Sequence, residues 1–348
     1  MSTTRVAIIG LGRMGSTICD EVADYPVFTL PFSIAGACVA SEKLELIAGA
    51  DLLPEKRQAF TERWGIKATF EDFREMIEKE SPDMVCICTK GVNHSELTVA
   101  VAELGVPMIF CEKAMACSMA EADAAKAAIE KAGSRFLTGV LRRWKTSYQE
   151  ARKRIVAGDI GEPRRAIHFA QSSLLHGHVH SVDTLMFLLG DPKAESLWGE
   201  LHPRDLKFEN GRLEKDPTSI YQIAFEGGIE ATTIQSGNWD FEIHGTEGVV
   251  RIANNGGHLS IRKQLEYSKK FRPFIETQLP PPLLPRSGTV QMLEDLVDAN
   301  AEGRPTSGDI DQVHHCTEIL FAIAECHHLG LHRHTLPVQN RELYVFHI

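Results

Sequence analysis

A glycine-rich turn near the N-terminus constrains the fold more than any other feature of the sequence. The turn GLGRMG (10–15) directly follows the apolar run RVAII and directly precedes the helical pattern STICDEVA. In such a turn the first glycine permits the tight bend, the second lets backbone N–H groups approach a pyrophosphate, and the third allows close packing of helix on strand. The helix N-terminus adds the positive end of its dipole to the phosphate site. The residues expected to contact a dinucleotide are Gly10, Gly12, Arg13, Met14 and Gly15.

Short apolar runs alternate with helical patterns over the first 140 residues. The runs LELIAGAD, DMVCICT and PMIFCEK are almost continuously apolar, which is typical of parallel strands covered on both faces. A helical stretch follows each run, and the last of these stretches should end at Gly133. Residues 1–140 are therefore expected to form a doubly wound α/β domain of the Rossmann type. The segment 25–43 lengthens the first crossover, and either an extra helix or an interface element would account for it.

The pattern changes after Arg142, where predicted strands follow one another directly. RRAIHFAQ, AESLWGEL, SIYQIAFEGGIEATTIQ and DFEIHGTEGVVRI have glycine turns between or within them, which predicts a mainly antiparallel sheet. The stretch LPPPLLP (279–285) predicts an extended connector, and two helical patterns follow it. Residues 141–348 are therefore expected to form a second, α+β domain.

Charge and composition argue against several classes of partner and compartment. The formal net charge is −10 and no long Lys/Arg run is present, so nucleic acid is not expected as a ligand. No apolar run reaches the roughly 18 residues of a membrane helix, and the N-terminus lacks the layout of a signal peptide. The eight cysteines lie mostly in apolar strand or helix patterns, which suits reduced, buried thiols better than disulfides. We expect a cytoplasmic protein without a membrane partner.

An acidic residue at the end of the second predicted strand bears on the choice of cofactor. Asp51 would accept hydrogen bonds from the adenosine ribose and repel a 2′-phosphate, which favours NAD over NADP. It lies 36 residues beyond Gly15, whereas about 20 is usual, so the inserted segment has to loop out. Lys56 and Arg57 follow closely and keep NADP open as an alternative.

Several motifs, in the same order, resemble those of the Gfo/Idh/MocA oxidoreductases. They are GLGRMG, GVNHSELTVAVAELGVPMIFCEKAMA, LRRW, GDIGEPRRA, HVHSVDTLMFLLG and IHGTEGVVRI. The resemblance implies an NAD(P)-dependent enzyme that acts on a sugar, a polyol or a related derivative. It also implies that the second domain binds substrate and assembles a homodimer or homotetramer through an exposed sheet face.

One signature of that family stands at the end of a Rossmann strand. The family's Glu-Lys-Pro is Glu112, Lys113 and Ala114 here, so the lysine matches and the proline does not. The resemblance places Lys113 near nicotinamide and substrate, with Glu112 beside it on the cofactor side. It implies a cofactor-side role for His94 as well, for which the alternative is a helix cap. Thr89 ends another strand where loops meet a dinucleotide, and we include it among the cofactor residues.

The family's second signature, Asp-x-Gly-x-His-x-x-Asp, corresponds to residues 176–183. His180 and Asp183 match, whereas His176 stands in place of the usual active-site aspartate and His178 replaces the glycine. At about 100° per residue, His176, His180, Asp183 and Phe187 would share one narrow face of a helix, away from the core. This face would line a cleft or be solvated, and His178 would point toward the core.

These residue types suit hydride transfer from a carbinol carbon. The reaction needs a group that takes the hydroxyl proton and a group that stabilises the developing charge on oxygen. We expect His180 to be the general acid/base and Lys113 to polarise the oxygen. His176 is expected to be a substrate ligand or a second acid/base, and Asp183 to orient His180 or bind substrate.

Other polar residues have structural interpretations of equal standing. Arg143 and Trp144 lie at the junction of the two expected domains, where they would reach the substrate or pack. His176 and His180 have a zinc-compatible spacing, but no third ligand is specified, so no metal is expected. The histidines and cysteines of the C-terminal helical pattern are expected to pack.

The leading hypothesis is therefore an NAD-dependent dehydrogenase or reductase of a sugar, cyclitol or related hydroxylated small molecule. One alternative is a redox-neutral lyase or glycosidase that uses tightly held NAD. A second alternative is a catalytically silent dinucleotide-binding regulator, which the missing proline and the missing aspartate favour.

Overall fold

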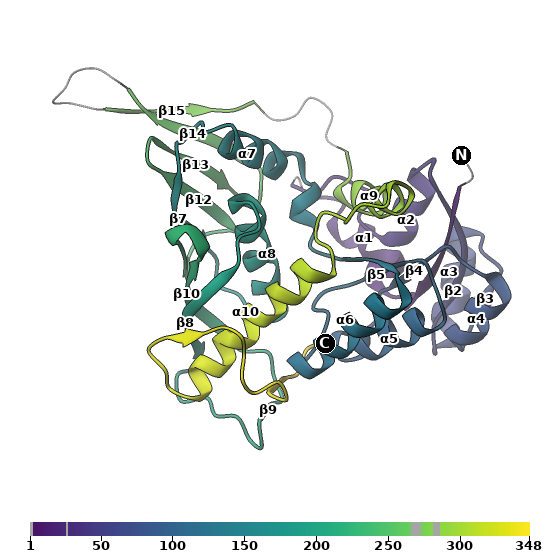
Figure 1. Cartoon of the computed structure of the whole chain (residues 1–348). Helices are drawn as coiled ribbons and strands as arrows, with labels where there is room; N and C mark the ends of the chain where they lie inside the picture. Colours follow the sequence, from purple (N-terminus) through teal and green to yellow (C-terminus); the bar gives the residue numbers. More distant parts are fainter. Residues whose placement is uncertain (1–2, 26, 266–272, 281–285) are drawn as a thin grey trace. The chain divides into compact units, whose positions relative to one another are not determined.

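The computed structural model describes residues 3–25, 27–265, 273–280 and 286–348. Backbone contacts divide the chain into two compact units (Figure 1). The first unit comprises Met1–Leu141, Arg286–His314 and His347–Ile348, and the second comprises Arg142–Pro285 and His315–Phe346. The two domains expected from the sequence were divided once, at residue 140, whereas here the chain returns to the first unit at Arg286–His314.

A six-stranded parallel sheet forms the centre of the first unit. Its strand order, β3-β2-β1-β4-β5-β6, reverses between β1 and β4, as in doubly wound dinucleotide-binding folds. All residues of β4 and β5 are buried, which explains their continuous apolar sequences. The predicted Rossmann architecture is confirmed. The strands are β1 Thr4–Ile9, β2 Leu44–Ala50, β3 Thr69–Phe70, β4 Met84–Ile87, β5 Met108–Cys111 and β6 Arg135–Thr138.

Local signals explain where the helices of the first unit begin and end. Pro54 starts α3 at a position where its missing N–H is not needed. Ser118 caps α6 by accepting a hydrogen bond from the Glu121 N–H, and Gly133 ends α6 at φ 69°, as predicted. The helices are α1 Ile18–Val22, α2 Ile34–Ala40, α3 Pro54–Trp64, α4 Phe73–Glu80, α5 His94–Glu103, α6 Met119–Ala132 and α9 Gly288–Glu302.

The inserted segment 25–43 contains an additional helix, which was one of the two alternatives for it. Ser33 caps α2, and Ile34–Cys38 are buried. α2 packs against β1, β2 and α9, while α9 also packs on β5 and β6. The insertion therefore adds to the core of the first unit, and the second strand still ends beside the glycine-rich turn.

A nine-stranded, mainly antiparallel sheet dominates the second unit, which confirms the predicted α+β fold. Its order is β15-β14-β13-β12-β7-β11-β10-β8-β16, and only β7 and β11 pair in parallel among these described strands. Gly227 and Gly228 form the β10–β11 turn with φ near 75°. The strands are β7 Pro163–Phe169, β8 Ala194–His202, β10 Thr218–Phe225, β11 Ile229–Ile234, β12 Asp240–Gly245, β13 Gly248–Ala253, β14 His258–Gln264, β15 Phe274–Gln278 and β16 His334–Thr335; β9 Arg212–Leu213 pairs separately with β17 Tyr344–Val345.

Helices cover one face of this sheet. α7 (Thr146–Val156) packs on β13 and β14, α8 (His178–Leu189) packs on β7, and Ile323 of α10 (Ile310–His328) packs against Gly199 of β8. Outward-facing charges such as Glu242 and Arg251 pair across neighbouring strands. Most of the predicted Pro-rich connector, residues 281–285, lies outside the described residues.

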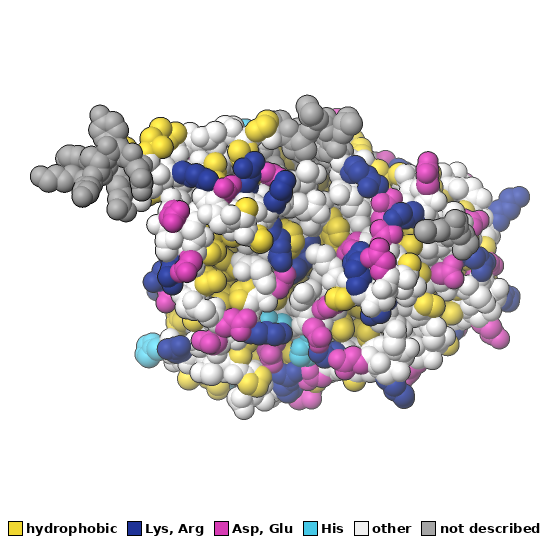
Figure 2. All heavy atoms as spheres, turned by 45° about the horizontal axis from the view of Figure 1, so that its top comes forward, with side chains coloured by type: hydrophobic (Ala, Val, Ile, Leu, Met, Phe, Trp, Pro, Cys, Tyr) yellow, Lys and Arg dark blue, Asp and Glu magenta, His cyan; other side chains and the backbone are white. Residues whose placement is uncertain are grey.

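The surface in Figure 2 carries acidic and basic side chains that are interspersed over the face shown. Among the described helices, none combines the length and the apolar character needed to cross a membrane.

Candidate functional site

The glycine-rich turn provides a cradle at the switch point of the parallel sheet. Gly10 has φ 91°, and a Cβ there would lie 2.8 Å from the backbone carbonyl of Cys88. A Cβ on Gly15 would lie 2.2 Å from the Gly10 carbonyl oxygen. A Cβ on Gly12, by contrast, would meet nothing within 4 Å. The space next to Gly12 is therefore where a bound group could approach the backbone, and this fits a pyrophosphate.

The residues after Gly12 form one turn of π-helix, Arg13–Thr17, before α1 begins. The Arg13 guanidinium is exposed and donates to both carboxylate oxygens of Glu21, at 2.7 to 3.0 Å. Met14 is half-buried beside it. In this conformation Arg13 is engaged in a surface ion pair, and Gly12 supplies the open side of the turn.

Asp51 lies beside the glycine-rich turn despite the long insertion between them. Its carboxylate accepts hydrogen bonds from the Leu11 N–H at 2.9 Å and from the Leu53 N–H at 3.0 Å. A carboxylate has about four lone-pair sites, so acceptor capacity remains for a ribose hydroxyl. Arg57 donates to the carbonyl oxygens of Asp51 and Leu52, at 2.6 and 3.1 Å. These contacts engage Arg57, one of the two cations that kept NADP open as an alternative; the other is Lys56.

His94 connects two strand ends of the parallel sheet. It is the first residue of α5, and its ring nitrogens lie 2.7 Å from the Ala114 carbonyl oxygen and 3.2 Å from that of Thr89. Burial lowers the pKa of His94 to about 4, so the ring is neutral near pH 7 and has one N–H to donate. The peptide bond between Lys113 and Ala114 is cis. His94 thus ties Thr89 to the turn that follows Lys113.

Glu112 is a buried carboxyl beneath the half-buried Lys113. Burial raises the pKa of Glu112 to about 7, against the lowering effect of the nearby Lys113 charge. Its Oε2 accepts a long hydrogen bond of 3.4 Å from the Lys113 backbone N–H. A Cβ on Gly139 would lie 2.5 Å from the same oxygen, so the absence of a side chain there makes room for the carboxyl.

The helix of the second family signature differs from its predicted geometry. α8 begins at His178, so His176 precedes the helix and is exposed, with its backbone N–H donating to Asp216 at 2.7 Å. Residues 181–188 are all buried, so the predicted polar stripe facing away from the core is wrong. The periodicity located the helix, but helices and sheet enclose it on every side. His180 is half-buried, and its ring centroid lies 6.2 Å from that of Trp239.

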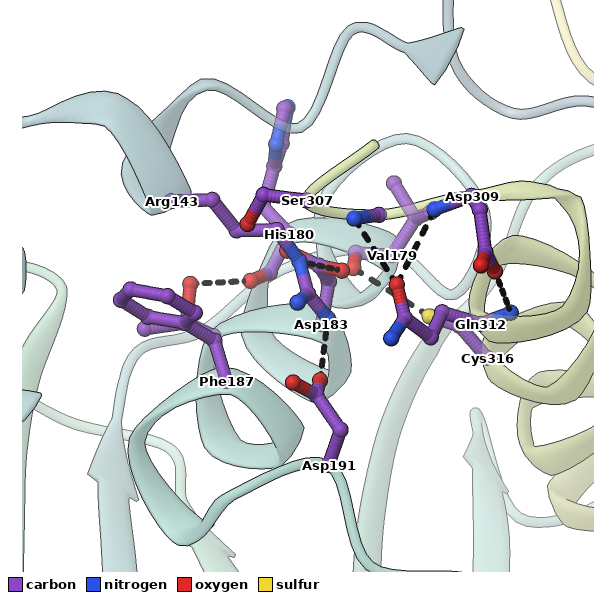
Figure 3. A network of polar contacts seen from close by, with 12 residues as sticks. Arg143, Val179, His180, Asp183, Phe187, Asp191, Ser307, Asp309, Gln312 and Cys316 are labelled. Atoms are coloured by element: carbon purple, nitrogen blue, oxygen red, sulfur yellow. Dashed lines mark hydrogen bonds and ion pairs between the residues drawn. The ribbon is translucent and has the colours of Figure 1, made fainter. Parts of the chain in front are cut away.

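Asp183 is part of a buried ion-pair network (Figure 3). Its Oδ1 accepts a hydrogen bond from Nε of Arg143 at 2.7 Å, and Nη2 of Arg143 donates to Asp191 at 2.7 Å. The side chains of Arg143 and Asp183 are 1% and 2% exposed. Burial alone would lower the pKa of Arg143, but the two carboxylates raise it above its usual value. Trp144, the next residue, is also buried.

Arg142 lies in the same short 3₁₀ turn, Leu141–Trp144, but has different surroundings. Its Nη2 donates to Asn255 Oδ1 at 2.8 Å, and its Nε donates to the Tyr148 hydroxyl at 3.3 Å. The guanidinium lies 4.5 Å from the centre of the Trp239 ring. The sequence analysis missed Trp239 and Asn255. The only signal was a tryptophan within the turn-rich stretch SGNWD between two strands.

The two other histidines near α8 belong to the core of the second unit. His178 Nδ1 lies 3.2 Å from Ser181 Oγ, which in turn lies 2.8 Å from Nε2 of His168. All three side chains are fully buried, and burial lowers the pKa of His178 to about 4. The core-facing orientation predicted for His178 is confirmed. Within the described ranges, no group of three His, Cys, Asp or Glu side chains could hold a metal ion.

Comparisons with known proteins agree with these features. Residues 4–140 match the family model GFO_IDH_MocA, described as "Oxidoreductase family, NAD-binding Rossmann fold". The chain is 27% identical over 266 residues to the scyllo-inositol 2-dehydrogenase (NAD(+)) of Bacillus subtilis, covering 71% of this chain and 73% of the relative.

Two solved structures share the fold over almost the whole chain. One is the aldose-aldose oxidoreductase of Caulobacter crescentus, with TM-score 0.77, 20% identity and coverage of 96% and 100%. The other is a levoglucosan dehydrogenase in complex with NADH, with TM-score 0.74, 21% identity and coverage of 97% and 100%. At these identities the structural likeness establishes the fold alone.

Proposed function

We propose that this chain transfers a hydride between nicotinamide and a secondary hydroxyl or carbonyl of a sugar, cyclitol or related polyol derivative. Residues 4–140 match the model of the Gfo/Idh/MocA oxidoreductases with their NAD-binding Rossmann fold. The observation that carries the proposal is the open backbone at Gly12, bounded by two glycines whose positions no larger residue could take. It makes this turn a place for NAD, and Asp51, which also holds Leu11, has acceptor sites left for the ribose.

NAD, when bound, supplies the acceptor or donor of the hydride. In the oxidising direction the carbon–hydrogen bond breaks with its electron pair moving to the nicotinamide, and the hydroxyl proton must go to a base. We assign that proton to the imidazole of His180, because imidazole is the side chain that most often serves as a general acid and base. Lys113 binds the substrate oxygen and stabilises the negative charge that develops on it.

The buried network around α8 supports a positioning role for Asp183. Asp183 lies one turn after His180 on α8 and is bound by Arg143, so the pair fixes the helix that presents the imidazole. Of the two roles expected for Asp183, orientation fits its burial better than substrate contact. The near-complete burial of Arg143 and Trp144 likewise supports packing roles. His176, exposed before the helix, stays the candidate for a substrate ligand or a second acid/base.

The test is an absorbance assay at 340 nm with NAD, and separately NADP, over a panel of sugars, inositols, sugar acids and glycosides. We expect NADH formation with one substrate class, and a C-deuterated substrate should slow it if hydride transfer limits the rate. Lys113→Ala and His180→Asn should each lower kcat by at least about 100-fold while NAD still binds. The matched controls are Lys79→Ala, at an exposed side chain of α4, and His244→Asn on β12, outside the proposed site.

Two outcomes would contradict the proposal. Products without net NADH would indicate the redox-neutral cycle, in which NAD is reduced and reoxidised within one turnover. NAD binding without any turnover across the panel would indicate a dinucleotide-binding regulator.

A further inference from the structure

Arg142 is a buried cation with neutral partners. It is 8% exposed, and its two hydrogen bonds go to the amide oxygen of Asn255 and the hydroxyl of Tyr148. Within the part of the chain that the structure describes, no carboxylate oxygen lies within 4 Å of its guanidinium nitrogens. Arginine stays charged in proteins, so it cannot escape the cost of burial by losing a proton. Burying a charge without a paired counter-ion is strongly unfavourable.

We propose that Arg142 binds a carboxylate group on the substrate, so that the chain acts on an acidic sugar or polyol; this inference rests on the oxidoreductase function proposed above. The counter-ion that the fold does not supply arrives with the ligand. Guanidinium carries five N–H donors, of which two are used, and its remaining planar edge matches the geometry of a carboxylate. A single cation without a paired carboxylate suits one negative charge, which favours a carboxylate over a phosphate dianion.

The turns that hold Arg142 have unusual backbone conformations. Trp239 has φ 58°, and Asn255 has φ 51°. A positive φ at a bulky residue such as tryptophan is strained and persists where the surroundings fix it. Hydrogen bonds between the two turns do so here: Asn238 Nδ2 donates to Asn254 Oδ1 at 2.7 Å, and the Asn255 N–H donates to the Asn238 carbonyl at 3.0 Å.

This arrangement places the indole of Trp239 next to both the guanidinium and His180. The ring is 4.5 Å from Arg142 and 6.2 Å from the imidazole. Trp239 is half-buried, and an aromatic ring at such a position gives a sugar ring an apolar surface to lie on. A substrate carboxylate at Arg142 would therefore lie within one small molecule's length of the proposed proton acceptor.

The local field is positive. Burial, and then the charge of Arg142, lower the pKa of Lys145 to about 7. The carboxylate of Asp240, the first residue of β12, accepts a hydrogen bond from the Asn254 N–H at 2.6 Å and forms no ion pair with Arg142 among the described residues. A bound anion would be stabilised by both cations, and it would raise the pKa of Lys145 again.

The first experiment compares matched ligand pairs on the full chain with NAD present. The pairs are uronates with the parent aldoses, aldonates with the alditols, and a carboxylated cyclitol with its neutral counterpart. Sugar phosphates are tested as well, as anions without a carboxylate. We expect kcat/KM, and affinity by calorimetry, to favour the acid by about 10- to 100-fold. Equal or better use of the neutral partner, preference for the phosphate, or no binding of any acid would each overturn the inference.

The second experiment ties that preference to the residue. Arg142→Gln should remove most of the preference in kcat/KM for the acid over the neutral ligand. The kcat/KM for the neutral ligand itself, which has no carboxylate for Arg142 to bind, should change less than about threefold, and Arg142→Lys should restore part of the preference. Arg165→Gln on β7, an exposed arginine paired with Glu230, is the matched control and should leave the ratio unchanged. Equal losses for acid and neutral ligands in Arg142→Gln would indicate a structural role. If Arg142→Gln does not fold, the ratio in Arg142→Lys decides the question.

The two proposals can fail separately. Carboxylates that bind in an Arg142-dependent way, without NADH formation by any ligand, would uphold the anion site and overturn the oxidoreductase function. Turnover of neutral sugars alone would do the reverse.

Discussion

Arg142 and Arg143 are neighbours in one short turn, both are buried, and their surroundings differ in one respect. Arg143 has two carboxylates within hydrogen-bond distance, on Asp183 and Asp191, whereas Arg142 has an amide and a hydroxyl. The fold supplies Arg143 with two hydrogen-bonded carboxylates, whereas none of the described carboxylates forms a hydrogen bond or ion pair with Arg142. A residue with a complete environment serves the structure, and one with an incomplete environment indicates where a ligand belongs.

The largest effect on stability should come from replacing Arg143, the arginine that the fold pairs with carboxylates. Arg143→Gln leaves the buried carboxylate of Asp183 without its cation and Asp191 with Arg152 alone, and we expect it to lower the free energy of unfolding by about 3 to 5 kcal/mol. Urea denaturation followed by circular dichroism measures this change. Arg152→Gln, which removes only the half-exposed partner of Asp191, should cost less than about 1 kcal/mol. Equal losses in the two variants would refute the distinction.

Glu112 is a buried acid, and unlike a buried arginine it can become neutral, by binding a proton. Its pKa is raised to about 7 by burial, above the usual value near 4.5. Between these two values the folded state holds a proton that the unfolded state has released, so stability should fall as pH rises from about 4.5 to 7. Glu112→Gln should remove this component and be the more stable protein above pH 7, by on the order of 3 kcal/mol. Parallel pH profiles for both proteins would contradict the assignment.

Much of the fold was predictable because its signals are local. The glycine spacing of the first turn, Pro54 at the start of α3 and Gly133 at the end of α6 each act within a few residues. Helical periodicity likewise located α8. It could not show what the helix faces, since the partner of Asp183 lies 40 residues earlier in the chain.

The candidate anion site could not be predicted from the sequence either, because its residues are far apart in the chain. Asn255 reaches Arg142 across 113 residues, and Trp239 reaches it from a different turn. No spacing within one segment encodes such a meeting, and an arginine in the run LRRW looks the same whether or not a carboxylate will face it.

Arg142→Gln should have a small effect on stability, in contrast to Arg143→Gln. It removes a buried charge that no described carboxylate pairs with, so the gain offsets the loss of two hydrogen bonds to neutral acceptors, and we expect a change within about 1 kcal/mol. The same variant should lose the rise in melting temperature that an acidic ligand gives the wild type, because only a ligand bound to the folded state stabilises it. Thermal denaturation with and without a uronate measures both quantities. A cost above about 3 kcal/mol would place Arg142 in the same class as Arg143.

Gly12 and Gly15 in the first turn differ in the same way as Arg142 and Arg143, and the expected effect on stability is the smallest of the four predictions. Gly15 is enclosed, since a Cβ would lie 2.2 Å from the Gly10 carbonyl, whereas a Cβ at Gly12 would point into open space. Gly12→Ala should therefore change the free energy of unfolding by only a few tenths of a kcal/mol, but weaken NAD binding by at least about tenfold, because the methyl group fills the space the pyrophosphate needs. Calorimetric titration with NAD measures the affinity, and Gly105→Ala, in a turn remote from the cradle, controls for the added methyl. If Gly12→Ala binds NAD as tightly as the wild type, open space beside a backbone is not sufficient evidence for a ligand, and the same doubt would then apply to Arg142.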